Sequence, residues 1–182
     1  MDKKRVLLLL FAAAVVIVGA AASQLSAGTP KLRAASKAPR AVVRHVNARI
    51  TRRYRTMTWR WQAVMGMRRA HSSAHLNTRR ALRFWWRSAR YVRRLAERVP
   101  HKSAWLCIHR YEGSWTDSGD PYWGGLQMDR GFMRSYAPGV LLRRGFANHW
   151  TPLEQMWVAE RAHHSGRGFF PWPNTAHYCG LI

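Results

Sequence analysis

The stretch 109-HRYEGSWTDSGDPYWGGLQMD-129 places one glutamate, Glu112, among aromatic residues. A carboxylate stands out here, because the chain of 182 residues holds only 8 Asp and Glu against 31 Lys and Arg. Trp105 and Ile108 precede Glu112 at helical spacing, and Gly113 belongs to the residue type that commonly ends helices. We therefore expect Glu112 to project from the last turn of a helix.

The surroundings expected for Glu112 favour proton donation. The C-terminal end of a helix carries partial negative charge, and Trp115, Tyr122 and Trp123 would withdraw the carboxyl group from water. Both effects favour the protonated form of a carboxylic acid, which can act as a general acid. Aromatic rings also stack on sugar faces. The combination points to cleavage of a glycosidic bond, with Glu112 as the catalytic acid.

The residues after Glu112 predict a turn and a short β-hairpin. The segment 116-TDSGDP-121 has turn chemistry, and the two glycines of 122-YWGGLQMD-129 allow close approach of another backbone. We expect a sugar chain to lie along this hairpin. Its neighbouring polar and aromatic side chains are the candidate substrate-binding residues: Trp115, Asp120, Tyr122 and Gln127. The amide of Gln127 can both donate and accept hydrogen bonds.

Three motifs follow one another in this part of the chain: 112-EGSW-115, 121-PYWGGLQMD-129 and 147-ANHWTPLEQMWVAERAHHSGRGFFPWPNTAHYCGL-181. Together they resemble the transglycosylase-like domain of the actinobacterial resuscitation-promoting factors, over roughly residues 103–182. The resemblance implies a small lysozyme-like fold that binds peptidoglycan glycan strands. It also implies one catalytic glutamate, and Glu112 is the position that matches.

The expected target is the bond between N-acetylmuramic acid and N-acetylglucosamine in the bacterial wall, and two kinds of product stay open. Inverting and conventional retaining hydrolases need a second carboxylate. Asp117 and Asp120 are the nearest in sequence, although a turn also explains them. A lytic transglycosylase needs one acid–base group, because the 6-hydroxyl of the sugar is the nucleophile. Substrate-assisted hydrolysis also uses few carboxylates.

The fold class expected is α+β and mainly α, with a lysozyme-like domain at residues 101–182. One helix begins with Thr151 as cap, Pro152 in the first position and Glu154 three residues after the cap, which is the pattern of a capping box. We interpret Glu154 as a cap and Glu160 as structural.

No metal and no cofactor are expected. His163 and His164 are adjacent, so they do not share a helix face, and no third ligand stands at metal spacing.

The first 23 residues are typical of a signal peptide or an uncleaved membrane anchor. A basic start precedes an uncharged apolar run and then small residues. We therefore expect a secreted or membrane-anchored protein at the cell wall. An exported chain can keep a disulfide, and Cys107 and Cys179 are the only two cysteines. Closing a loop of about 70 residues would stabilise the fold by about 4 kcal/mol in the chain-entropy model.

The basic charge is concentrated in residues 31–100, which hold 20 Lys and Arg and one acid, Glu97. The whole stretch 24–100 is interpreted as a basic linker with an amphipathic helix at about 77–99. Its apolar stripe consists of Leu82, Trp85, Ala89, Val92, Ala96 and Val99. Its opposite face consists of Arg80, Arg83, Arg87, Arg90, Arg94 and Arg98.

This basic region is either a solvated surface or an adhesive one. The expected partners are anionic wall polymers or anionic lipid headgroups, and the Trp and Leu face suits lipid. Nucleic acid is not an expected partner, because the chain carries an export signal and no recognisable nucleic-acid module. The alternative for the whole protein is a non-catalytic cationic wall- or membrane-binding protein on a lysozyme-like fold.

Overall fold

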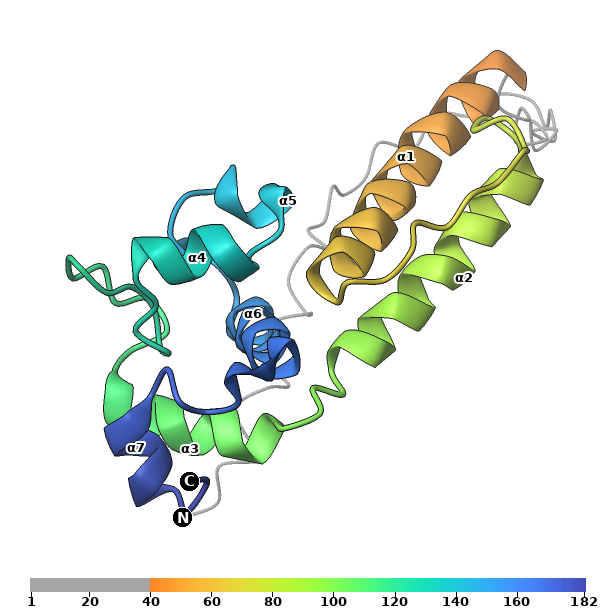
Figure 1. Ribbon diagram of the computed structural model, residues 1–182. Helices are drawn as coiled ribbons and strands as arrows, with labels where there is room; N and C mark the ends of the chain where they lie inside the picture. Colours follow the sequence, from red (N-terminus) through yellow and green to blue (C-terminus); the bar gives the residue numbers. More distant parts are fainter. Residues whose placement is uncertain (1–39) are drawn as a thin grey trace, which may run out of the picture. The chain divides into compact units, whose positions relative to one another are not determined.

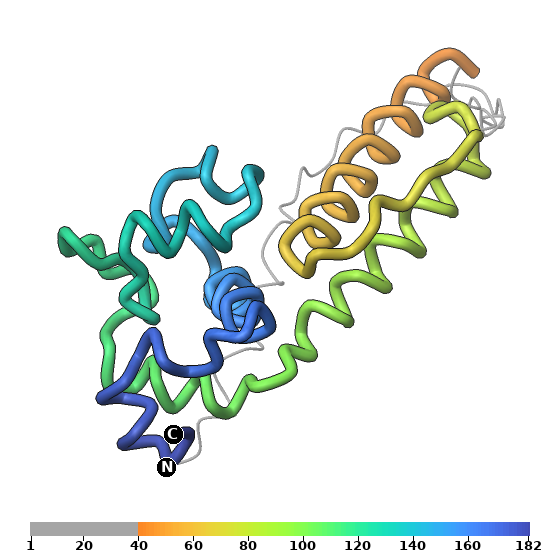
Figure 2. The backbone as a smooth tube through the Cα atoms, viewed as in Figure 1, coloured from red at the N-terminus to blue at the C-terminus, as the bar shows by residue number. Residues whose placement is uncertain are grey.

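The structure is a computed structural model that describes residues 40–182 (Figures 1 and 2). The expected export or anchor segment, residues 1–23, and the linker that precedes Arg40 lie outside the described residues. The described part is mainly helical, and none of its helices is long and apolar enough to cross a membrane. In chain order the elements are α1 (Arg40–Val64), α2 (Arg79–Ala96), α3 (Lys102–Glu112), α4 (Arg130–Tyr136), α5 (Gly139–Leu142), η1 (Ala147–His149), α6 (Pro152–Ala162), η2 (His163–Arg167) and α7 (Pro173–Tyr178).

The amphipathic helix expected at about residues 77–99 is confirmed as α2. Thr78 caps it, because its side-chain oxygen accepts a hydrogen bond from the backbone N–H of Ala81. The expected apolar stripe is buried except at Leu82, which is half-buried while Ala81 is fully buried. The helix ends at Ala96, three residues before the expected end at about residue 99.

The sequence does not predict α1, because the buried face of this helix is not apolar. The side chains that face inward recur at helical steps but are mostly small or polar: Ala48, Thr51, Thr58, Gln62 and Val64. Thr58 Oγ1 donates to the backbone carbonyl of Tyr54 at 2.8 Å, and the backbone N–H of Ala70 donates to Gln62 Oε1 at 3.0 Å. These bonds satisfy polar groups that burial would otherwise leave without partners. A stripe of this kind leaves little trace in hydropathy.

Helices α1 and α2 run side by side in the same direction, and residues 65–78 return the chain between them (Figure 1). Both helices end near α6. The indole N–H of Trp157 donates to the carbonyl of Ala96 at 2.8 Å, and Arg161 donates to the carbonyl of Ala63 at 3.4 Å. The ends of the two basic helices are therefore attached to the same helix of the C-terminal region.

Glu154 joins α1 to α6. It forms the predicted capping box with Thr151, and it is fully buried. It also pairs with Arg60 of α1 and with Arg144, the latter at 2.9 Å. Burial opposes ionisation of Glu154, but hydrogen bonds from the Thr151 backbone and the two arginines outweigh it and lower the pKa of this carboxyl group. The interpretation as a cap is confirmed, and the structure adds a second role in holding α1.

The hydrophobic core lies mainly in the C-terminal region, among α3, α4, α6 and α7, and it also includes Val64 of α1 and Val99. Its largest buried side chains include Trp105, Ile108, Leu126, Met133 and Trp172. The disulfide expected between Cys107 and Cys179 is confirmed, and it ties α3 to the end of α7. The bridge lies at the edge of the core and connects residues 72 positions apart in sequence.

The expected β-hairpin is not formed as a pair of strands. Between residues 40 and 182 the only β pairing is one isolated antiparallel bridge, Trp123 with Met128. Gly124 and Gln127 have positive φ angles of 76° and 45°, so the chain curls within the bridge and does not extend. The segment after Glu112 is therefore a compact turn closed at its base.

Candidate functional site

Glu112 is the last residue of α3. Helix α3 lies beside α7 (Figure 1), and the disulfide joins α3 to the residue after α7. The side chain of Glu112 is half-buried, and its Oε1 accepts a hydrogen bond of 2.7 Å from the hydroxyl of Thr175 in α7. Gly113 follows with φ 154° and ψ −170°, a conformation available almost only to glycine. A Cβ atom there would lie 3.2 Å from Gln127 Nε2 and 3.3 Å from Asp117 Oδ2. The turn therefore packs directly behind Glu112.

Among the carboxylates of residues 101–182, Glu112 is the one that, in the described part of the chain, pairs with no cation, caps no helix and accepts no hydrogen bond from an N–H group. Asp129 caps α4, and Asp120 pairs with Arg130 at 3.6 Å. Asp117, Glu154 and Glu160 accept several hydrogen bonds within the fold. Within residues 40–182, the one hydrogen-bond partner recorded for Glu112 is a neutral hydroxyl.

Asp117 and Gln127 organise the turn beside Glu112. Asp117 Oδ1 accepts from the backbone N–H of Gly119 at 3.0 Å, which is the local role expected of a turn aspartate. Gln127 Nε2 donates to Asp117 Oδ2 at 2.7 Å and to the carbonyl of Gly124 at 3.0 Å. Both amide hydrogens of Gln127 are thus engaged, so of the two functions expected for this side chain its carbonyl oxygen is the one left for a ligand. Its φ of 45° is the only positive φ of a non-glycine residue between residues 40 and 182.

The other three candidate binding residues occupy different environments. Trp115 packs inward, and its ring stacks on that of His109 with a centroid distance of 3.9 Å. Tyr122 is 49% exposed, and Asp120 is exposed at the outer edge of the turn. Trp115 therefore offers at most one ring face to a ligand, whereas the phenol of Tyr122 is open to solvent.

Tyr122 and Gln127 line a hollow of about 350 Å³ between the turn, the start of α4 and the segment that precedes α7. Arg167 and Trp172 complete its wall, and Trp172 directly precedes the helix that holds Thr175. Glu112 is not among the lining residues. Two larger hollows of about 540 and 640 Å³ lie on α2 and beside α6, and neither contains a sequence-predicted site residue.

Gln155 is a residue that the sequence does not single out and that positions this site. It is fully buried in α6, and its Oε1 accepts from the backbone N–H of Gly125 at 2.8 Å. Its Nε2 donates to the carbonyls of Trp115 at 2.8 Å and Ala147 at 2.9 Å. A Cβ atom on Gly124 would lie 2.5 Å from Gln155 Oε1, so this glycine permits the approach. Helix α6 buries three polar side chains, Glu154, Gln155 and Glu160, so no single polar position in the sequence marks Gln155.

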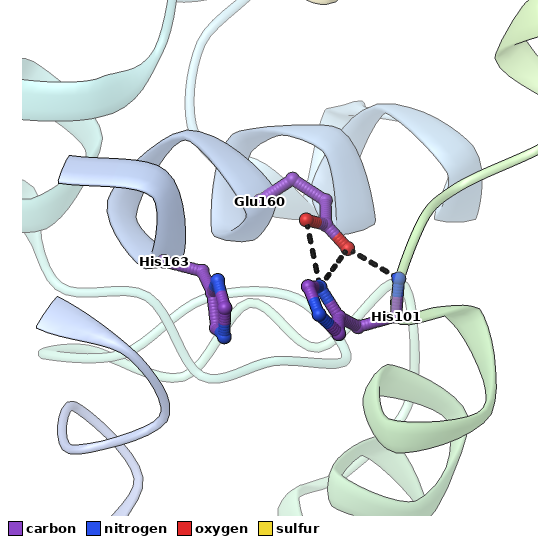
Figure 3. A group of neighbouring side chains, drawn as sticks. All are labelled: His101, Glu160 and His163. Atoms are coloured by element: carbon purple, nitrogen blue, oxygen red, sulfur yellow. Dashed lines mark hydrogen bonds and ion pairs between the residues drawn. The ribbon is translucent and has the colours of Figure 1, made fainter. Parts of the chain in front are cut away.

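A second group of titratable side chains lies at the opposite end of α3. His101 precedes α3, Glu160 lies in α6 and His163 begins η2 (Figure 3). Glu160 is buried, as its structural interpretation requires, and it accepts hydrogen bonds from the backbone of His101 at 2.8 Å and the indole of Trp105 at 2.7 Å. Burial, followed by the charge of His101, lowers the pKa of His163. The spacing of histidines in the sequence does not reveal this group.

The arginines of α2 are exposed, whereas its apolar stripe is not. All six arginines expected to face away from the stripe lie at the surface. Trp85 packs edge-on against Trp59 of α1 with a centroid distance of 5.6 Å. The apolar face that would suit lipid is therefore buried against α1. A hollow on the outer face of α2 is lined by Arg80, Arg83, Phe84, Arg87, Ser88 and Tyr91. The surface that remains is cationic with aromatic rings between the guanidinium groups.

Comparisons of the chain with protein-family models, with curated proteins and with solved structures found no match.

Proposed function

We propose that residues 101–182 form a lysozyme-like module that cleaves peptidoglycan glycan strands, with Glu112 as the general acid and base. The observation that carries the proposal is the isolation of Glu112 among the carboxylates of this region. It is half-buried, it is held by the neutral hydroxyl of Thr175, and the turn packed behind it contributes Tyr122 and Gln127 to the wall of an open hollow. General acid–base catalysis needs a positioned carboxyl group whose proton is not already committed to a salt bridge.

A lytic reaction uses this single group twice. Glu112 donates its proton to the glycosidic oxygen, and the bond from C1 of N-acetylmuramic acid to that oxygen breaks. N-acetylglucosamine leaves as an alcohol. The Glu112 carboxylate then accepts the proton of the muramic acid 6-hydroxyl. The O6 atom of that hydroxyl bonds to C1 of the same sugar, which yields a 1,6-anhydro end. The commitment of Asp117 and Asp120 to local partners supports this route over hydrolysis.

The glycan would lie across the turn and the hollow beside it. Tyr122 supplies an exposed aromatic ring for a sugar face, and Gln127 supplies a carbonyl oxygen for a hydroxyl or amide hydrogen. Arg167 in the wall of the hollow adds a cation near anionic substituents of the strand. Asp120 and Trp115 contribute less directly, because one pairs with Arg130 and the other stacks on His109.

The exposed arginines of α2 would hold the exported enzyme on a phosphate-bearing wall polymer. The buried stripe of α2 supports a polymer over lipid, because an amphipathic helix binds a bilayer by inserting its apolar face. Arg80, Arg83 and Arg87 lie one turn apart along one hollow, which suits repeated anionic groups on a chain. The same surface favours the second candidate function, a cationic wall-binding protein without turnover, because it does not involve Glu112.

The test is mass spectrometry of purified peptidoglycan after digestion with the full chain and with Glu112→Gln. Products with 1,6-anhydro ends, absent with the variant, would support the lytic enzyme. Reducing ends that require Glu112 would mean a hydrolase, and Asp117→Asn would then be the next variant. Release by both proteins would refute the assignment of Glu112. Binding of peptidoglycan without release by either protein would favour the non-catalytic candidate.

A further inference from the structure

We propose that His101, Glu160 and His163 form a binding site for a divalent transition metal ion of the Zn²⁺ class. One ligand atom from each residue can be chosen so that all three lie within 4.8 Å of one another. The residues come from the start of α3, from α6 and from the start of η2, and Figure 3 shows the two imidazole rings beside the Glu160 carboxylate. Two imidazoles and one carboxylate are a common ligand set for zinc.

The distance between His101 and Glu160 already matches shared coordination. His101 Nδ1 lies 3.2 and 3.1 Å from Oε1 and Oε2 of Glu160. Two atoms that each bind zinc at about 2.0–2.2 Å with tetrahedral angles lie about 3.3–3.5 Å apart. Shared coordination of an ion would therefore need these atoms to move only slightly further apart.

His163 completes the set after a small rotation. Its ring packs on that of His101 with a centroid distance of 4.2 Å and an interplanar angle of 37°. Turning the half-buried ring about its side-chain bonds brings a ring nitrogen towards the other two ligands.

The charge at this position also supports a cation. Glu154 and Glu160 are two buried glutamates in the same helix, α6. Glu154 is paired with Arg60 and Arg144, whereas no Lys or Arg among residues 40–182 pairs with Glu160. Removing a carboxylate from water is costly unless a positive charge compensates it. A metal ion at this site would supply to Glu160 what two arginines supply to Glu154.

The Glu160 carboxylate is also held in the orientation that a ligand needs. The backbone N–H of His101 and the indole N–H of Trp105 donate to its Oε1 at 2.8 and 2.7 Å. Such outer hydrogen bonds fix ligating groups in metal sites. Oε2 receives no donor other than the His101 ring among the described residues, so it is the oxygen available to an ion.

The site is separate from Glu112. His101 and Glu112 flank α3 at its two ends, and a helix of 11 residues is about 16 Å long. An ion here would join the start of α3 to α6 and η2, so it would act on stability and not on the glycosidic bond. The proposal therefore does not depend on the proposed enzymatic function.

The test is a Zn²⁺ titration of the full chain, purified without a histidine tag, followed by calorimetry and by thermal unfolding. We expect one tight equivalent per chain and an unfolding midpoint that rises with free Zn²⁺. Substitution of Co²⁺ should give the visible absorption of a tetrahedral ion. Chelation should lower the midpoint to that of the metal-free protein.

The matched variants are His163→Gln and His164→Gln, because the second changes an exposed neighbouring histidine outside the cluster. Loss of an outer-shell partner alone weakens metal sites by about 10–100-fold, so His163→Gln should weaken Zn²⁺ binding by at least about 10-fold, and His164→Gln should not. Glu160→Gln is the second ligand variant, with circular dichroism to confirm that each variant folds. Equal affinity in all variants, or no stoichiometric binding by the unaltered chain, would overturn the proposal and leave Glu160 with only its hydrogen bonds to His101 and Trp105.

Discussion

The basic helices and the C-terminal region differ in where their charged side chains lie and in what those side chains contact. In α2 the arginines face solvent, and the one acid of that helix end, Glu97, lies 4.0 Å from Arg93 with both side chains largely exposed. In residues 101–182 most carboxylates are bound to caps, cations or turn amides. Surface charges in water contribute little to stability, so the basic surface is free to serve binding. The few acids of the C-terminal region instead shape the fold, and Glu112 is the exception.

The largest expected effect is on the rate of glycan release, when one glutamate in each region is replaced by glutamine. Glu112→Gln removes the proposed proton donor, so release of glycan fragments should fall by about 10²–10⁴-fold. Glu97→Gln, an exposed glutamate beside α2, should leave the rate unchanged. The measurement is the initial rate of fragment release from purified peptidoglycan at equal protein concentration. A similar loss in both variants would show that Glu112 has no special role.

Removing the disulfide should destabilise the C-terminal region more than the pair α1 and α2. Replacing Cys107 and Cys179 with Ala should lower the free energy of unfolding by about 4 kcal/mol, because the reduced chain gains the freedom of a long loop. The bridge ties α3 to α7 and lies outside the pair α1 and α2. We expect hydrogen exchange to quicken first in α3 and α7. Uniform quickening along α1 and α2 as well would mean that the two regions unfold as one.

Glu154 is the contact through which the C-terminal region depends on the basic one. Glu154→Gln leaves Arg60 and Arg144 without a charged partner and should cost about 3 kcal/mol in the free energy of unfolding. The pKa of Glu154 is lower in the folded chain than its ordinary value of 4.5. Its contribution is therefore fully present above about pH 4.5 and is lost as the pH falls through the lowered pKa. Denaturant unfolding across this range should show a smaller acid-induced loss for the variant than for the unaltered chain.

The smallest expected effect on the fold comes from the exposed arginines. Arg83→Gln with Arg87→Gln should change the free energy of unfolding by less than about 1 kcal/mol. The same pair should weaken binding to a phosphate-bearing wall polymer, and the remaining affinity should depend less on salt. Arg134→Gln with Arg143→Gln removes the same charge from exposed positions elsewhere and should weaken binding less. Equal losses would indicate net charge and not a surface on α2, and preferential loss of binding to anionic vesicles would indicate lipid.

The amino-acid sequence by itself determined the features that depend on neighbours within a few turns. The stripe of α2, the Thr151–Glu154 capping box and the position of Glu112 at the end of α3 are confirmed, because caps and helical periods are local. The disulfide could be predicted because the chain has only two cysteines, and the structure confirms it.

Only the tertiary structure decided which distant polar groups meet. The inward face of α1 is Thr and Gln, the hub of the turn is Gln155, and Glu160 meets His101 from 59 positions away. Gln155 and Glu160 are buried with hydrogen-bond partners that lie 30 or more positions away. In α1 the bonds of Thr58 and Gln62 are local, and the packing of α1 against other helices buries these side chains. A hydropathy pattern reports which residues avoid water, but it does not report which hydrogen-bonding groups will find one another.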